Sequence, residues 1–217
     1  MTDDGTKGAE RTREALIDAG TDLFGRLGFA GASTREIAGR AGVNIAAIAY
    51  HFGGKEGLRL ACIEAIGARL GAIVERAGPM PVTPHAAKLR LEAIVRAAVT
   101  FMAVEARAQA IAAFLLREIT TETGPLIDTV FQRIVEPRHR AVCQLWGLAT
   151  GTDPESEETR LSVFAMIGQV IYFRIGQPMV LRRMGWDVID VNAAGRIADL
   201  LVRNLRAALA ATERDLP

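Results

Sequence analysis

Apolar residues recur at intervals of three or four along nearly the whole chain, which is the spacing of one face of an α-helix. No stretch of about four to eight residues alternates apolar and polar positions convincingly, as a half-buried β-strand would. The pattern therefore predicts an all-α fold. The first helical stripe consists of Ala15, Leu16, Ala19, Leu23, Phe24 and Leu27.

Three helices are predicted before Lys55, the last two of them short. We expect them to end at the glycines of positions 28, 42 and 53, because glycine readily adopts the left-handed conformation that follows a helix end. Ser33 and Thr34 can cap the second helix, and Asn44 can cap the third. The third helix should cover residues 45–51.

A longer helix should run from Lys55 to about Ala77. The segment 78–84 holds three of the eight prolines and marks the one clear connector in the chain. Beyond it, Pro137 should kink one of the helices, because proline in a helix interior removes a hydrogen bond. The helices expected after the connector cover 85–105, 108–121, 125–148, 155–175 and 191–211, with a short turn near 179–184. This gives about nine helices in all.

The glycine-containing turn between the second and third helices is typical of a helix-turn-helix, in which the last helix enters the major groove of DNA. The residues around this turn are Thr34-Arg35-Glu36-Ile37-Ala38, Ala41-Gly42-Val43-Asn44, Ile48, Tyr50-His51-Phe52 and Lys55-Glu56. Over about positions 10 to 58 they resemble the N-terminal signature of the TetR family of bacterial transcriptional repressors. The resemblance implies a DNA-binding domain of three helices.

The second half of the chain is similar to the CecR-like subgroup of that family and to its C-terminal regulatory domain. The residues that carry this similarity are Arg117-Glu118, Thr121, Thr123, Pro125, Gly168-Gln169, Phe173, Pro178 and Gly185-Trp186. The similarity implies a homodimer that responds to a ligand. It names no ligand.

The net charge of the chain is small, but one segment is locally basic. The chain holds 26 Lys and Arg against 25 Asp and Glu, with a net charge of +1, so bulk positive charge cannot drive its binding to nucleic acid. Between Phe24 and Leu60, however, five basic residues face two acidic ones, a local charge of +3. The five are Arg26, Arg35, Arg40, Lys55 and Arg59. A solvated surface is the alternative interpretation of this patch.

Several residues of the motif are candidates for DNA contacts. Thr34 and Lys55 stand at helix starts, where free backbone N–H groups and a cation suit a phosphate. Arg35 can reach the O6 and N7 atoms of guanine, although a phosphate contact stays open for it. The third helix offers polar groups at Asn44, Tyr50 and His51, and small apolar groups at Ala46 and Ala47 that can touch thymine methyls.

Two points about the third helix stay open. Tyr50 and His51 can also pack at the helix end without touching DNA, and His51 could meet a base or a phosphate. Members of the family commonly carry an aromatic residue where this chain has Ala49, which puts one implied contact in doubt.

The regulatory half predicts an effector pocket where polar side chains interrupt apolar helix faces. The candidate residues are Met102, Arg117, Phe131, Gln169, Tyr172 and Arg174. A small, largely apolar or aromatic molecule would suit them. The alternative is that Arg117 and Glu118 make a satisfied structural ion pair, for which they would need separate partners because adjacent helical residues point in different directions.

Small residues on the last two long helices would let helices approach closely and suit a subunit interface. They are Ala165, Gly168, Gly176, Ala194, Ala198 and Ala208. Cys62 and Cys143 lie 81 positions apart on apolar helical faces, so we expect two reduced structural thiols.

An enzyme is not expected. The spacing of Glu136 and His139 is that of carboxylate-bridged di-iron sites, but the chain has no second copy and Pro137 disturbs the helix. Neither a nucleophile elbow nor a phosphate-binding loop is present. We therefore predict no catalytic residues, metal or cofactor. A helical ligand-binding or protein-docking module, in which the helix-turn-helix only packs, is the alternative function.

The longest nearly uncharged run, Leu161 to Phe173, is too short and too polar to span a bilayer, and the polar start lacks a secretion signal. The sequence thus predicts a cytoplasmic repressor without a membrane partner. Residues 1–54 would bind DNA, residues 55–83 would form a linking helix and connector, and residues 84–217 would hold the effector and the dimer contact. A two-fold dimer would read a near-palindromic operator with half-sites about 34 to 36 Å apart, or a multiple of this.

Overall fold

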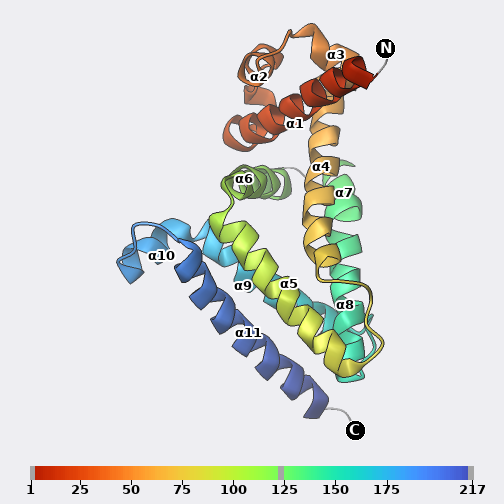
Figure 1. Ribbon diagram of the computed structural model, residues 1–217, viewed down its shortest axis with the longest axis vertical. Coiled ribbons are helices and arrows are strands. Elements are labelled where there is room, and N and C mark those ends of the chain that lie inside the picture. Colours follow the sequence, from red (N-terminus) through yellow and green to blue (C-terminus); the bar gives the residue numbers. More distant parts are fainter. Residues whose placement is uncertain (1–2, 122–124, 215–217) are drawn as a thin grey trace. The chain divides into compact units, whose positions relative to one another are not determined.

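The computed structural model describes residues 3–121 and 125–214 and contains helices but no strands in these ranges (Figure 1). The all-α prediction is confirmed. The helices are α1 (Asp3–Gly31), α2 (Thr34–Ala41), α3 (Ala46–Phe52), α4 (Lys55–Arg76), α5 (Pro84–Val104), α6 (Ala106–Thr121), α7 (Pro125–Val130), a π-helical turn η1 (Phe131–Val135), α8 (Glu136–Thr150), α9 (Glu157–Ile175), α10 (Gln177–Met184) and α11 (Val191–Arg214).

The helices outnumber the expected nine for two local reasons. The predicted helix 125–148 is divided into α7, η1 and α8, and Pro137 lies in the first turn of α8, where its missing N–H costs nothing. The segment near 179–184 is a full helix, α10. At Gly28, where α1 was expected to end, the backbone is kinked (φ 76°, ψ 169°), and helix resumes as far as Gly31.

The described chain packs as two compact units. Unit 1 consists of Met1–Arg69 and Ala110–Ile134, and unit 2 of Leu70–Gln109 and Val135–Pro217. Residues 110–134 therefore pack with the N-terminal helices, although they follow α5 in the sequence. The three functional ranges predicted from the sequence describe roles rather than packing, and they stay a prediction.

The core of unit 1 is formed by α1, α2, α4 and the second half of α6. It is built on fully buried side chains: Leu16, Phe24, Ile37, Leu58, Ile63 and Phe114. At the crossing of α1 and α6 the residue must be glycine, because a Cβ on Gly25 would lie 2.9 Å from the backbone nitrogen of Phe114. This close approach fixes the second half of α6 against α1.

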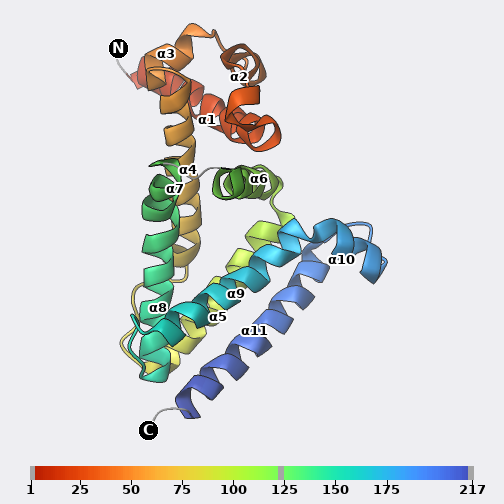
Figure 2. The same ribbon diagram turned by 180° about the vertical axis from the view of Figure 1, so that it is seen from behind.

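Unit 2 is a bundle in which α5, α8, α9 and α11 pack around Trp146 and Leu91 (Figures 1 and 2). Three ion pairs cross the seam between α5 and α11: Lys88–Glu213, Glu92–Arg206 and Arg96–Asp199. The numbers rise on α5 and fall on α11, so the two helices run antiparallel.

Both cysteines are free and buried, as predicted. Burial raises the pKa of the Cys62 thiol to about 12 and that of Cys143 to about 11. Both thiols are therefore protonated and unreactive at neutral pH.

Within the described ranges no single helix is both long and apolar enough to cross a membrane. Two bent pairs of helices reach that length and composition only together.

Candidate nucleic-acid interface

The start of α2 is fixed by a capping box. The Ser33 hydroxyl accepts a hydrogen bond from the Glu36 backbone N–H (3.1 Å), and the Glu36 carboxylate accepts one from the Ser33 N–H (3.0 Å). The pKa of the Glu36 carboxyl is lowered by a hydrogen bond from the Ser33 hydroxyl (2.7 Å) and by the one from the Ser33 N–H. Ser33 is thus the cap, and Thr34 is the first helical residue, followed by the exposed Arg35.

The turn into α3 depends on Gly42 and Asn44. Gly42 is left-handed (φ 69°), and its N–H closes the end of α2. The side-chain oxygen of Asn44 accepts a hydrogen bond from the Ala46 N–H (2.8 Å), as the predicted cap requires.

Helix α3 is anchored on one side and open on the other. Ile48 is its one buried residue, whereas Ile45, Ala46, Ala49 and Tyr50 are exposed. Tyr50 is 83% exposed.

The two polar candidates at the end of α3 touch each other. The half-buried His51 ring meets the Tyr50 ring edge-on, with centroids 4.9 Å apart. Tyr50 has little packing beyond this contact, which favours the binding interpretation for it over helix-end packing.

The start of α4 is held by an aromatic ring that the sequence analysis did not single out. Lys55 Nζ lies 4.5 Å from the centroid of the Phe29 ring, and the Arg59 guanidinium lies 4.4 Å from it. No local pattern in the sequence links Phe29 to these two cations, because they lie on a later helix. The contact orients Lys55 at a helix start, where backbone N–H groups are free for an anion.

The junction between α3 and α4 also requires glycine at a position that sequence reasoning missed. Gly53 and Gly54 have positive φ (72° and 139°), as the predicted helix end requires. A Cβ on Gly57 would lie only 1.8 Å from the carbonyl oxygen of Phe52. The first turn of α4 thus packs directly on the backbone that ends α3.

Ion pairs within unit 1 reduce the number of unpaired cations in the predicted basic patch. Arg26 and Arg40 both pair with Asp22, at 3.6 and 3.0 Å. Arg59 forms two hydrogen bonds to the buried Glu118 carboxylate, of 3.1 and 2.6 Å.

Two of the five basic residues remain without a carboxylate partner in the described chain: Arg35 and Lys55. The acidic partners of the other three lie outside the window from which the local charge was counted. Of the predicted basic patch, Arg35 and Lys55 are therefore the cations left to neutralise an anion.

The effector candidates fall into both units. In unit 2, Arg174 Nη1 donates to the Met102 carbonyl (3.5 Å) and to Gln177 (3.2 Å), and burial lowers the pKa of Arg174. Gln169 accepts from Asn204 (2.8 Å), and Tyr172 is exposed. The structure thus brings Met102 and Arg174 into contact.

Arg117 and Phe131 belong to unit 1. Arg117 donates to the carbonyls of Gly25 and Arg26 (both 3.2 Å), while Glu118 pairs with Arg59. These are the separate partners that the structural alternative required. The six-residue effector pocket stays a prediction.

The predicted small-residue interface needs a correction. Ala194 and Ala198 are buried in the core of unit 2, 3% and 4% exposed, and Gly176 packs against Tyr172. The pattern failed there because small residues also serve close packing inside a monomer. Ala165, Gly168 and Ala208 are exposed.

Glu136 and His139, the two residues with di-iron spacing, each contact other groups of the protein. His139 Nε2 lies 3.1 Å from the Arg160 carbonyl oxygen, and its ring stacks on Phe164 at 3.9 Å. Glu136 accepts from Arg140 (3.2 Å). In the part of the chain that the structure describes, no three potential ligands gather into a metal site.

Two family profiles match the chain. Residues 16–62 match the family described as bacterial regulatory proteins, tetR family. Residues 87–212 match the C-terminal domain of the HTH-type transcriptional dual regulator CecR. The first match covers the second half of α1, all of α2 and α3 and the start of α4. The second covers most of unit 2 and also residues 110–134 of unit 1.

Whole-chain relatives agree with these matches. The chain is 34% identical over 190 residues to the HTH-type transcriptional dual regulator CecR of Shigella flexneri, covering 83% of each chain. Its fold resembles a TetR-like transcriptional regulator from Rhodococcus sp. RHA1 (TM-score 0.62, 21% identity, 92% and 96% covered). It also resembles AibR, solved in complex with isovaleryl coenzyme A and operator DNA (TM-score 0.63, 20% identity, 88% and 96% covered).

Proposed function

The chain belongs to the TetR family of bacterial regulatory proteins, with a C-terminal domain of CecR type, and we propose that it is a ligand-responsive repressor that binds operator DNA as a homodimer. The family consists of transcription regulators rather than enzymes. The observation that carries the proposal is the open face of α3, with Tyr50 83% exposed, between the starts of α2 and α4. We expect the protein in the cytoplasm, where operator DNA lies.

DNA binding would use two kinds of contact. Lys55 at the start of α4 and Thr34 at the start of α2 would hold phosphates, which position the protein without reading sequence. Arg35, Tyr50, His51 and the Asn44 amide would face base edges or the adjacent backbone, and Ala46 and Ala47 would lie near thymine methyls.

Dimerisation would use the exposed apolar stripe of α9. Leu161, Phe164, Tyr172 and Ile175 are between 47% and 60% exposed, and Ala165 and Gly168 continue the stripe between them. An apolar stripe of this extent on one helix is unusual for a free surface. Two copies related by a two-fold axis would cover it and place two α3 helices on one face of the operator.

Effector binding would release the operator. AibR was solved with both an acyl coenzyme A and operator DNA, which illustrates that this fold can hold both kinds of partner. We expect a small, largely apolar or aromatic effector in unit 2, with Arg174 and Gln169 as polar contacts. The signal would reach α3 through α4, whose first residues belong to unit 1 and whose last residues belong to unit 2.

The proposal is tested by selecting bound sequences from a random duplex pool and measuring their affinity at several salt concentrations. We expect a near-palindromic consensus and a steep loss of affinity with salt. Recovery of no consensus, with weak binding that is equal for all duplexes, would instead support a ligand-binding or docking module that does not recognise an operator.

A further inference from the structure

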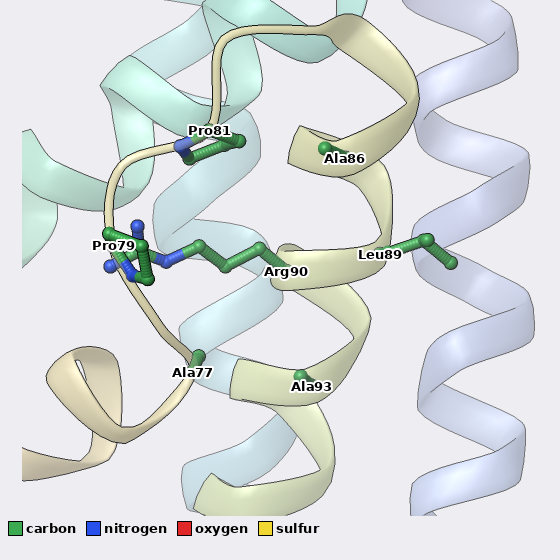
Figure 3. A pocket seen from close by; sticks show the side chains of 7 residues that line it. All are labelled: Ala77, Pro79, Pro81, Ala86, Leu89, Arg90 and Ala93. Atoms are coloured by element: carbon green, nitrogen blue, oxygen red, sulfur yellow. The ribbon is translucent and has the colours of Figure 1, made fainter.

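A hollow of about 310 Å³ lies between the connector after α4 and the first turns of α5 (Figure 3). This volume is at the lower end of the range of small-molecule pockets, about 300 to 1,000 Å³. Arg90 is the one charged residue of the lining, and the others are apolar. The lining residues are Ala77, Pro79, Pro81, Ala86, Leu89, Arg90 and Ala93, all in unit 2.

The guanidinium of Arg90 has more hydrogen-bond donors than the described residues around it offer acceptors. Its Nη2 donates to the carbonyl of Val74 (3.3 Å), whereas Nε and Nη1 are shielded from solvent and meet no acceptor among the described residues. Figure 3 shows the side chain extending from α5 to Pro79 on the connector. Buried polar groups are normally hydrogen-bonded and buried charges normally paired, so these two donors lack an acceptor that a ligand could supply.

The start of α5 has few backbone N–H groups left for an anion. Pro84 has no N–H, and the Ala86 N–H already donates to the Thr83 hydroxyl (3.3 Å). Because Arg90 is the one cation of the lining, the hollow suits a carboxylate, with a single negative charge, better than a phosphate group with about −1.5 to −2. The prolines favour an apolar body on that carboxylate.

We propose that this hollow binds a small monocarboxylate with an apolar body. The carboxylate accepts a hydrogen bond from one of the two unpartnered donors of Arg90, and the body lies against Pro79 and Pro81. Because Nε and Nη1 are covered, entry requires a small shift of the connector, which is not part of any helix. This site shares no residue with the effector candidates above and does not depend on DNA binding.

Calorimetric titration of the full chain with benzoate tests the proposal, with benzamide as the uncharged match. We expect saturable binding of one benzoate per chain and binding of benzamide that is weaker by about tenfold or more. Arg90→Gln should weaken benzoate binding by about the same factor. Arg96→Gln is the matched control on the same helix, because Arg96 is exposed and pairs with Asp199, and it should leave binding unchanged.

Ala93→Leu keeps Arg90 but fills the hollow, and it should also abolish binding. If Arg90→Gln does not fold, as judged by circular dichroism and thermal unfolding, Ala93→Leu decides alone. The proposal is overturned if benzoate does not bind saturably at millimolar concentration, if benzamide binds equally well, or if folded variants bind as the wild type does.

Discussion

We expect Lys55 to bind a phosphate, because a helix start and an aromatic ring together position its side chain. It stands at the start of α4 with its ammonium over the Phe29 ring, and no carboxylate pairs with it in the described chain. Lys55→Ala should weaken binding to all sequences almost equally and reduce the salt slope by about one unit. Lys88→Ala, which removes a cation paired with Glu213 in unit 2, is the control and should leave the slope unchanged. An unaltered slope for Lys55→Ala would remove this residue from the interface.

Arg26 and Arg40 both pair with Asp22, whereas Arg35 has no carboxylate partner among the residues that the structure describes. A free guanidinium can form two hydrogen bonds to guanine. Arg35→Ala should therefore relax the preference at one base pair by about 1 to 3 kcal/mol, as measured on a panel of single-substitution operators. A uniform loss over the whole panel would show that Arg35 contacts a phosphate instead.

Helix α2 carries a pH-dependent cap. Hydrogen bonds from Ser33 lower the pKa of the Glu36 carboxyl below its usual 4.5. Because the folded-state pKa is below the unfolded one, the cap stabilises the fold at neutral pH, and this contribution is lost as pH falls through the folded pKa. The advantage in unfolding temperature of the wild type over Glu36→Gln should shrink below pH 4.5. A difference that does not change with pH would rule out this linkage.

The junction of α3 and α4 depends on Gly57. A Cβ there would meet the Phe52 carbonyl at 1.8 Å, so Gly57→Ala must displace α3 or the first turn of α4. We expect a loss of stability of about 1 to 3 kcal/mol in denaturant unfolding, together with loss of operator binding. Gly39→Ala in α2 is the matched control, since nothing lies within 4 Å of its Cβ, and it should not lower stability. Equal stability of both variants would contradict the account of this junction.

Helices with strong periodicity were predictable almost to the residue. The expected spans 85–105, 155–175 and 191–211 correspond to α5 (Pro84–Val104), α9 (Glu157–Ile175) and α11 (Val191–Arg214). The irregular turn in the predicted helix 125–148 had a sequence signal in Pro137, which lies just after the π turn at Phe131–Val135, but proline alone did not predict the π form.

The parts of the candidate site that depend on helix caps and glycine turns were predictable from the sequence. Caps and glycine turns placed Thr34, Asn44 and Lys55 at helix starts, because these signals act over a few residues. The Phe29 ring under Lys55 and the pairing of Arg59 with Glu118 were not predictable, since those contacts join residues far apart in the sequence.

At the scale of the whole molecule, recognition of a two-fold operator requires two copies of the chain. Ala165 lies on the exposed stripe of α9 beside Phe164 and Gly168, so Ala165→Arg would place a charge in the proposed contact. We expect a folded monomer by light scattering, with operator affinity reduced to that for a single half-site. Gln144→Arg, an exposed position on α8, is the control and should stay dimeric. A dimer for Ala165→Arg would place the subunit contact elsewhere.

The measurement that tests the central claim most directly is a binding titration on two versions of the selected operator. One version is unaltered, and the other carries an insertion of about five base pairs, half a turn of DNA, between its half-sites. A dimer with two α3 helices at fixed separation should bind the altered duplex no more tightly than a single half-site. Equal affinity for both duplexes would contradict recognition of a two-fold operator by a homodimer.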